Sequence, residues 1–567
     1  MTKAPSIDSE KETGKSNPNA QEGPADFETA IAATGYGRFN YLLLLIALPC
    51  CTTTVFETTT MSYVLPSAEC DLELSLVDKG TLNAVTYVGM ISSAFLWGFL
   101  SDSYGRKQLL IYGFFLDATL NLLCASSQTV LAIMIFKFMG GFVICGPFAV
   151  LMAYLSEFHS LEHRSRVMIM VGIFYSIANI LLPSLAWVII PQNWDFMLFG
   201  GNFVIHSWQI FLAVSCVPSL LSGILVLFLP ESPKFLMSKG HNERALEVFR
   251  TLYALNSGRS RHEYPIKELV NELMLQPSPE PTSVSNSKPG PEDSAKPKAP
   301  SGGLQLLTVM FRRPHLRNSL LAYSIQFGIL LGLNTFRLWV PQLFTIIDEF
   351  DQDRNAGFSR DSASLCEMLA YKVNKTNMLL ETGSSATTTT TTLEVRPLAA
   401  FDMEELDLGT VILCEATTEG SMYLKSLIIG CVGLFAYLVT TVLINAIGNR
   451  NILVYGLSMA GLCGLALYWT KTSASILALS SAYITLASIA STALIGSVVA
   501  MFPTSMRTMV VSLTMMCGRT GSIIGNVLFP YLMSLGCWPP FLMIGTIQIA
   551  VSLLATTIPK TLKKPLQ

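Results

Sequence analysis

The chain alternates long apolar runs with polar segments. The first six runs cover about 39–63, 80–100, 108–126, 130–155, 167–190 and 207–229, and the second six cover about 318–341, 422–446, 451–470, 474–500, 508–534 and 539–558. At about 1.5 Å per residue, each run is long enough to cross roughly 30 Å of hydrocarbon. The pattern predicts an all-α membrane protein with twelve transmembrane helices in two six-helix bundles, 39–229 and 317–558.

Composition supports this class. Of 567 residues, 51% are hydrophobic and 13% are charged, and the mean hydropathy is +0.48. Soluble domains carry about 25% charged residues, so most of this chain belongs in lipid. A net charge of −2 argues against a nucleic-acid partner. The sequence has no phosphate-binding loop, metal-spaced Cys/His set or nucleophile elbow, so we expect neither an enzyme nor a cofactor or metal.

Basic residues at the ends of the runs predict the orientation. They fall on one side of the predicted topology, whereas the opposite loops at about 65–78, 191–205 and 535–538 contain almost none. The basic positions are Arg38, Arg106, Lys107, Arg164, Arg166, Lys234 to Arg317, Arg450, Arg507 and Lys560 to Lys564. The positive-inside rule then places both termini in the cytosol. The first apolar run is long enough to span, so we expect no cleavable signal.

The polar segments outside the apolar runs predict different structures and locations. We expect 1–38 to be a disordered cytoplasmic N-terminus and 559–567 a cytoplasmic tail. The cytoplasmic linker 230–316 has helical apolar spacing at 245–252 and 266–273, which predicts amphipathic helices, followed by a flexible stretch at 276–303. The polar loop 342–421 is expected on the luminal or extracellular side.

Two features of that loop are candidate modification sites. Asn374-Lys375-Thr376 is a glycosylation sequon, used only if the loop faces the secretory lumen. Cys366 and Cys414 share the loop and are candidates for a disulfide in an oxidising compartment. Most other cysteines lie within apolar runs, where we expect them to pack as small apolar residues.

The turn between the second and third runs carries a family motif. Gly98, Asp102, Gly105, Arg106 and Lys107 follow the order Gly, Asp, Gly-Arg-Lys between two apolar runs. This turn resembles the signature loop of major facilitator superfamily (MFS) transporters. The resemblance implies the MFS fold, in which two six-helix bundles enclose a central polar pocket.

Further stretches resemble a narrower group. They are Val64–Glu69, Ala94–Gly98, Ser156–Phe158, Ala186–Pro191, His206–Trp208 and Pro230–Phe235. They are similar to the synaptic vesicle glycoprotein 2 (SV2) family, strongly over about 36–250 and less so beyond. The resemblance implies either a monomeric transporter of a small sugar-like or ionic organic solute, with or without proton coupling, or a vesicle protein with a binding or trafficking role. It implies a plasma-membrane or secretory-vesicle location.

Charged residues at the cytoplasmic run ends are candidate gating residues. Asp102, Arg106, Glu157, Arg164 and Glu231 alternate in sign, and the family uses matching positions as a latch that closes one conformation. The alternative is that they only anchor helix ends.

The second half departs from this pattern. It keeps Arg507 but has Asn445, Ala500 and Lys560 where acids are usual, so we expect a weaker latch there.

Ionisable residues inside apolar runs are candidates for solute or ion binding. Glu57 lies in a Thr-rich run, with Thr54 where the SV2 pattern has a second acid. We expect Glu57 either to handle a proton or cation or to pack as a hydrogen-bonded acid. Asp117 and Lys137 are expected to pair with each other.

The remaining candidates come from the fifth, seventh and eleventh runs. Arg519 lies among small residues, and its expected partner is an anionic substrate, Glu57 or a structural acid. Tyr175 and Trp339 match aromatic positions of the SV2 pattern, so we expect them to clamp a ring between the two halves. For Trp339 the alternative is anchoring at the membrane interface.

Overall fold

The computed structural model describes residues 24–192, 194–198, 203–270, 315–355, 365–369, 420–502 and 504–558. Long helices occupy all twelve predicted positions. In the first half they are α2 (Arg38–Thr59), α4 (Leu76–Tyr104), α5 (Arg106–Ala125), α6 (Val130–Glu157), α7 (Leu161–Ile189) and the consecutive α8 (Ser207–Val214) and α9 (Val217–Leu227). In the second half they are α13 (Leu316–Asn355), α16 (Ser421–Ile447), α17 (Asn449–Ala466), α18 (Ser473–Met501), α19 (Thr504–Leu535) and α20 (Trp538–Ala555).

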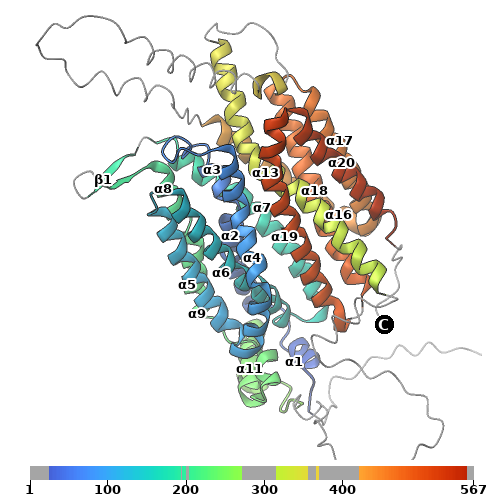
Figure 1. Ribbon diagram of the computed structural model, residues 1–567. Coiled ribbons are helices and arrows are strands. Elements are labelled where there is room, and N and C mark those ends of the chain that lie inside the picture. Colours follow the sequence, from blue (N-terminus) through green and yellow to red (C-terminus); the bar gives the residue numbers. More distant parts are fainter. Residues whose placement is uncertain are drawn as a thin grey trace, which may run out of the picture.

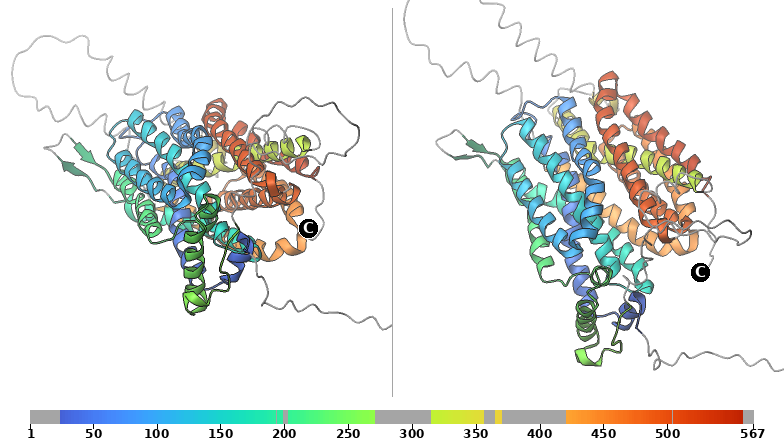
Figure 2. Two further views of the ribbon diagram at one scale, coloured as in Figure 1. Left: turned by 90° about the horizontal axis from the view of Figure 1, so that it is seen from below. Right: turned by 60° about the horizontal axis from the view of Figure 1, so that its bottom comes forward.

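These helices form two groups that follow the chain order. The first-half helices, blue to green, gather on one side and the second-half helices, yellow to red, on the other (Figures 1 and 2). The two groups meet where α4 packs along α19 and α7 packs along α16. The prediction of two six-helix bundles is therefore confirmed.

Ten helices in the described ranges, with α8 and α9 counted as one, are long and apolar enough to cross a membrane. The other two, α4 and α19, have 29 and 32 residues, so they are also long enough to span. Because α4 and α19 pack on each other between the two halves, part of their surface faces protein instead of lipid.

Two matching turns show how sequence sets the connections. Gly105 between α4 and α5 has φ +97°, and Gly448 between α16 and α17 has φ +83°. Residues with a Cβ rarely adopt such angles, so glycine allows an abrupt turn between antiparallel helices. At the other end of α4, Ser75 and Asp78 form a reciprocal capping box. Glycine and capping residues therefore fix where these helices begin and end.

Short elements cover one end of the first half, which we call the α11 end (Figure 1). They are α1 (Phe27–Ala33), α10 (Pro233–Ser238), α11 (Asn242–Ser257) and the 3-10 turn η2 (Arg261–Glu263). Asn256 of α11 accepts a hydrogen bond from the Phe39 backbone N–H at 3.0 Å, which ties α11 to the start of α2.

Two predictions at the α11 end are corrected. The segment 1–38 is not disordered throughout, because Phe27–Ala33 is helical and buries Phe27 and Ile31. The amphipathic helix at 245–252 is confirmed within α11. The second predicted amphipathic helix, at 266–273, is described only up to residue 270. That part is not helical, and Leu269 forms a β-bridge with Ala25. That bridge supplies backbone hydrogen bonds that a helix would otherwise provide.

The opposite end, which we call the hairpin end, carries α3 (Met61–Val64) and the antiparallel strands β1 (Phe196–Leu198) and β2 (Phe203–Ile205). Here α13 continues past the predicted end of its run to Asn355, so the polar loop begins later than residue 342. Asn374 and Cys414 lie outside the described residues.

Candidate functional site

The two halves are close at the hairpin end and diverge toward the α11 end. A Cβ added to Gly80, near the start of α4, would lie 2.7 Å from the backbone oxygen of Asn526 in α19. A Cβ added to Gly98, near the other end of α4, would meet no described atom within 4 Å. In this conformation α4 therefore approaches a helix of the other half closely at Gly80 and not at Gly98.

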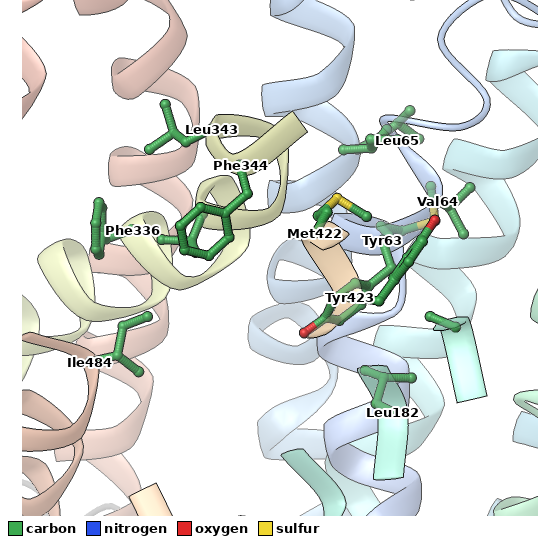
Figure 3. Close-up of a cluster of buried hydrophobic side chains, with 14 of the residues drawn as sticks. Tyr63, Val64, Leu65, Leu182, Phe336, Leu343, Phe344, Met422, Tyr423 and Ile484 are labelled. Atoms are coloured by element: carbon green, nitrogen blue, oxygen red, sulfur yellow. The ribbon is translucent and has the colours of Figure 1, made fainter. Parts of the chain in front are cut away.

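An apolar cluster seals the hairpin end, and we call it the apolar plug (Figure 3). Its members from the first half are Tyr63, Val64, Leu65 and Leu182, and those from the second half are Phe336, Leu343, Phe344, Met422, Tyr423 and Ile484. The Tyr63 and Tyr423 ring centroids are 6.3 Å apart across the boundary between the halves. Burial of these side chains against each other holds the halves together at this end.

A cavity of about 70 Å³ lies between the halves, next to the plug. Its walls come from α3 and α7 of the first half and from α13, α16 and α18 of the second. The lining residues are Tyr63, Ser176, Asn179, Arg337, Val340, Pro341, Ser426, Ile429, Gly430, Gly433, Tyr437, Ile484, Thr485 and Ser488. Eight of these fourteen have a polar or charged side chain and two are glycine, so the cavity wall carries many polar groups for its position between transmembrane helices.

Arg337 is the charged residue in this wall, and the sequence analysis did not select it. Its Nη2 is buried without a hydrogen-bond partner, and no ion pair within 4.0 Å joins Arg337 to an acid that the structure describes. A charged side chain at the centre of a membrane helix costs about 2.5–3.5 kcal/mol on insertion scales. Arg337 is the only charged residue in the run 318–341, which is the signal that could have identified it.

Two prolines lie one helical turn beyond cavity-lining residues. Pro341 in α13 follows Arg337 by four positions, and Pro183 in α7 follows Asn179 by four. Because proline has no N–H, the backbone carbonyls of Arg337 and Asn179 lose their intrahelical donors. Each half thus has, in a cavity-lining residue, a backbone carbonyl without its intrahelical donor.

A second polar group lies inside the first half, between α2, α5, α6 and α9. Lys137 Nζ is 3.1 Å from Glu57 Oε2, and both side chains are 1% exposed. Lys137 also donates to Asn121 Oδ1 at 3.0 Å, and Ser219 donates to Asp117 Oδ2 at 2.5 Å. This group does not line the cavity.

The predicted partners in this group need correction. Lys137 pairs with Glu57 instead of Asp117, and Asn121 connects the two, because its Nδ2 lies 3.4 Å from Asp117 Oδ2. A Cβ added to Gly140 would lie 2.4 Å from Glu57 Oε1, so the absence of a side chain there leaves room for the Glu57 carboxylate against α6.

The threonines of the Thr-rich run around Glu57 lie in α2 and do not line the cavity. Thr52, Thr53 and Thr58 donate to backbone carbonyls four residues earlier in the same helix, at 2.9, 3.1 and 2.8 Å. None of the α2 threonines lines the cavity. Thr54 is buried, and its hydroxyl has no hydrogen-bond partner among the described residues. The hydroxyls of Thr52, Thr53 and Thr58 are thus satisfied within α2 itself, so they need no partner in a cavity.

Arg519, Tyr175 and Trp339 also have other neighbours than predicted. Arg519 Nη1 lies 3.1 Å from Cys145 Sγ, so it contacts the first half but not Glu57. The Tyr175 ring packs on Phe148 with centroids 5.9 Å apart, and the Trp339 ring packs on Phe529 at 5.2 Å. The two rings therefore do not form a clamp, and Trp339, 1% exposed, is not an interfacial anchor.

The predicted gating residues form a network within the first half. Glu231 Oε1 accepts from the backbone N–H groups of Arg106 and Lys107 at 3.0 and 3.1 Å. Arg106 Nη2 is 3.4 Å from Glu157 Oε1, and Ser232 donates to Glu157 Oε2 at 2.5 Å. The network joins the α4–α5 turn to the ends of α6 and α9.

Other gating candidates lie elsewhere. Arg164 Nη2 pairs with Glu28 Oε1 of α1 at 2.8 Å, away from that network. The side chains of Asp102 and Arg507 are outside the described residues, although their backbones lie in α4 and α19. The described pairs therefore stabilise one half and do not cross to the other.

The predicted disulfide is also corrected. Cys366 is bonded to Cys537, at the start of α20, with their Cα atoms 5.2 Å apart. It does not pair with Cys414. Proximity along one loop was the basis of the prediction, whereas the fold brings residues 365–369 back to the second half at the hairpin end.

Known proteins with similar sequences are synaptic vesicle proteins. Synaptic vesicle glycoprotein 2B of Rattus norvegicus is 34% identical over 231 residues, which are 41% of this chain and 34% of that protein. Synaptic vesicle glycoprotein 2A of Rattus norvegicus is 30% identical over 243 residues, 43% of this chain and 33% of that protein. The chain thus matches about a third of the length of these relatives.

Solved structures with a similar fold are sugar transporters. The xylose transporter XylE from E. coli, in a partially occluded inward open conformation, has a TM-score of 0.59 and 14% identity, and the match covers 92% of this chain and 100% of that one. A D-xylose-proton symporter has a TM-score of 0.58 and 14% identity, and the match covers 93% of this chain and 99% of that one. These matches support the transporter fold.

Two family models cover most of the chain. The Major Facilitator Superfamily matches residues 47–365, more than half of the sequence, and Sugar (and other) transporter matches residues 407–567. The fold, the multi-pass membrane character and the sequence resemblance agree with these matches. The protein therefore belongs to the Major Facilitator Superfamily.

Proposed function

We propose that this protein moves a small organic solute across a membrane by alternating access. The observation that carries the proposal is the cavity between the halves, which contains the unpaired Arg337 and is closed at the hairpin end by the apolar plug. Transporters of this kind bind their solute between two bundles that rock against each other. A cavity sealed at one end only by side-chain packing is suited to that motion.

The orientation follows from the basic residues. We place the α11 end and both termini in the cytosol, with the hairpin end facing the lumen or the cell exterior. The conformation described here is then closed on the outer side and parted along α4 and α19 on the cytosolic side. We further propose that the protein is a monomer in the plasma membrane or a secretory-vesicle membrane.

We assign proton coupling of transport to the buried group formed by Glu57, Lys137 and Asp117. Two carboxyl groups share one buried ammonium group through Asn121, so the three cannot all be charged without a net buried charge. Their position inside the first half, away from the cavity, means that coupling would act through the packing of α2 and α6.

A second candidate function has a specific observation in its favour. The charge network around Glu231 lies in one half, and the second half lacks the acids that would form its counterpart. A vesicle-membrane protein that binds a solute or partner without turnover would need only one such network. We rank this binding function second because the cavity retains an unpaired cation.

Uptake into proteoliposomes tests the first function. The purified full-length chain is reconstituted and offered a mixed library of labelled sugars, organic anions and organic cations. Time-dependent accumulation above that of protein-free liposomes supports transport. Binding of a library member in detergent without accumulation in vesicles supports the second function instead.

Topology mapping tests the orientation. Glycosylation at Asn374 and modification of a cysteine introduced at Arg106 are scored from each side of the membrane. The proposal expects the two positions in different compartments. Finding them in the same compartment contradicts the two-bundle arrangement in the membrane.

A further inference from the structure

We propose that the solute carries a carboxylate or a similar oxyanion and that Arg337 binds it in the central cavity. The proposal rests on the proposed function, because it names the chemical class of solute that the same cavity accepts. The expected ligand is a small organic acid with a hydroxyl or carbonyl oxygen beside the anionic group.

The first observation is the concentration of unsatisfied polar atoms in one small wall. Arg337 Nη2 and Thr485 Oγ1 are buried and have no hydrogen-bond partner among the described residues, and both residues line the cavity. Buried polar groups in folded proteins are nearly always hydrogen-bonded. Two unsatisfied donors, from α13 and α18, that line one cavity indicate a ligand with acceptor atoms.

The second observation is the balance of intramembrane charge. Lys137 is neutralised by Glu57, and Lys425 by Asp348 near the hairpin end. Arg519, like Arg337, is within 4.0 Å of no acid in the described part of the chain. The cations that remain uncompensated between the halves are therefore arginines, which favours an anion there over a cation.

The two arginines belong to one polar region. Both come from the second half and reach the first, because Arg337 lines the cavity together with Ser176 and Asn179 of α7 and Arg519 Nη1 lies 3.1 Å from Cys145 Sγ of α6. Arg337 shares the cavity wall with Tyr63 of α3 and Tyr437 of α16. The positive charge therefore extends across the boundary that a bound solute would bridge.

The geometry of the guanidinium group narrows the chemical class of the solute. Its planar fork binds a carboxylate through two parallel hydrogen bonds, which an uncharged sugar cannot accept in the same way. The backbone carbonyls of Arg337 and Asn179, freed by Pro341 and Pro183, are suited to accept from a hydroxyl of the same ligand. A cavity of about 70 Å³ is far below the roughly 300–1,000 Å³ of sites for drug-sized ligands, so we expect a small acid.

The experiment uses a matched pair of probes, L-lactate and its neutral amide L-lactamide. Ligand-induced thermal stabilisation of the full-length protein in detergent is measured over a concentration series, with equal sodium chloride as the reference. We expect lactate to raise the melting temperature and lactamide and chloride to leave it unchanged. Arg337→Gln should weaken the lactate response about tenfold or more, because a charge-assisted hydrogen-bond pair is lost.

Three variants sharpen the test. Arg337→Lys keeps the charge but loses the fork and should retain part of the response. Thr485→Val should weaken it without removing it. Arg244→Gln, on the exposed surface of α11, is the matched control and should behave as wild type. If Arg337→Gln does not fold, the lysine and valine variants still separate a binding role from a structural one.

The outcomes distinguish this inference from the transport function. Lactate binding that depends on Arg337, without uptake into proteoliposomes, supports the inference and contradicts transport. Uptake of a neutral sugar that is unchanged in Arg337→Lys supports transport and overturns the inference. Equal stabilisation by lactate and lactamide, by lactate and chloride, or by none of the three also overturns it.

Discussion

Lys137 Nζ lies 3.1 Å from Glu57 Oε2 in a site where both side chains are 1% exposed. The pair joins α2 to α6 inside the first half. Its position away from the cavity separates the buried ion pair from solute recognition. The two roles can therefore be tested independently.

Breaking this pair should destabilise the protein strongly. Glu57→Gln leaves the Lys137 ammonium buried without its counter-charge, and removal of one partner of a buried pair costs about 3–5 kcal/mol. The double variant Glu57→Gln/Lys137→Met should recover much of the loss. Thermal unfolding in detergent measures both, and equal melting temperatures for wild type and Glu57→Gln would contradict the pairing.

Glu231 should stabilise the α4–α5 turn. Glu231→Gln weakens the charge-assisted bonds to the Arg106 and Lys107 backbone N–H groups, at an expected cost of about 1.5–3 kcal/mol. Limited proteolysis at the turn should become faster. Glu243→Gln on the exposed start of α11 is the control and should leave proteolysis unchanged.

The Cys366–Cys537 disulfide should be detectable and stabilising. Peptide mapping without reduction should recover the two cysteines in one linked fragment. Cys537→Ser should make Cys366 reactive toward alkylating reagents and lower stability by about 2–4 kcal/mol. Cys431→Ser, which removes an exposed free cysteine, serves as the control and should change neither property.

Gly80 should control the closed end of the bundle. Gly80→Ala places a Cβ 2.7 Å from the Asn526 backbone oxygen, so α4 and α19 must separate at the hairpin end. We expect faster labelling of a cysteine introduced at Val64 in the apolar plug. Gly98→Ala has open space around the new Cβ and should not alter the labelling rate.

His159 should make stability depend on pH. Burial lowers the pKa of His159 below its ordinary value, and the hydrogen bond to the Leu155 carbonyl only partly opposes this. The unfolded chain then binds the proton more readily than the folded one. The stabilising contribution is therefore present above about pH 6.5 and is lost as the pH falls through the folded-state pKa. Melting curves at several pH values should show a larger acid-side decrease for wild type than for His159→Gln.

The sequence predicted the helices well because their lengths follow from bilayer thickness. Apolar runs located all twelve helices, including α4 and α19, which pack on each other between the halves. The sequence did not predict which buried charged residues pair with each other. Whether Lys137 meets Glu57 or Asp117 depends on how α2, α5 and α6 are rotated about their axes, which no single run encodes.

Arg337 and Cys366 also show that a single segment of sequence does not reveal contacts with distant segments. The cavity around Arg337 is built by helices of both halves, so a search within one apolar run cannot show that its guanidinium is unpaired. Cys366 pairs with a residue 171 positions away, whereas shared loop membership suggested a nearer partner. Contacts between distant segments decided both cases.

The proline positions have a mechanical consequence. Pro341 interrupts the hydrogen-bond ladder of α13 at the level of the cavity, so the outer part of that helix, which carries Asp348 and its partner contact with Lys425, can bend as a separate lever. Pro183 does the same for α7, whose outer part contributes Ala186 to the apolar plug region. The hairpin end would then open by flexing of two helix tips, before any rotation of whole bundles.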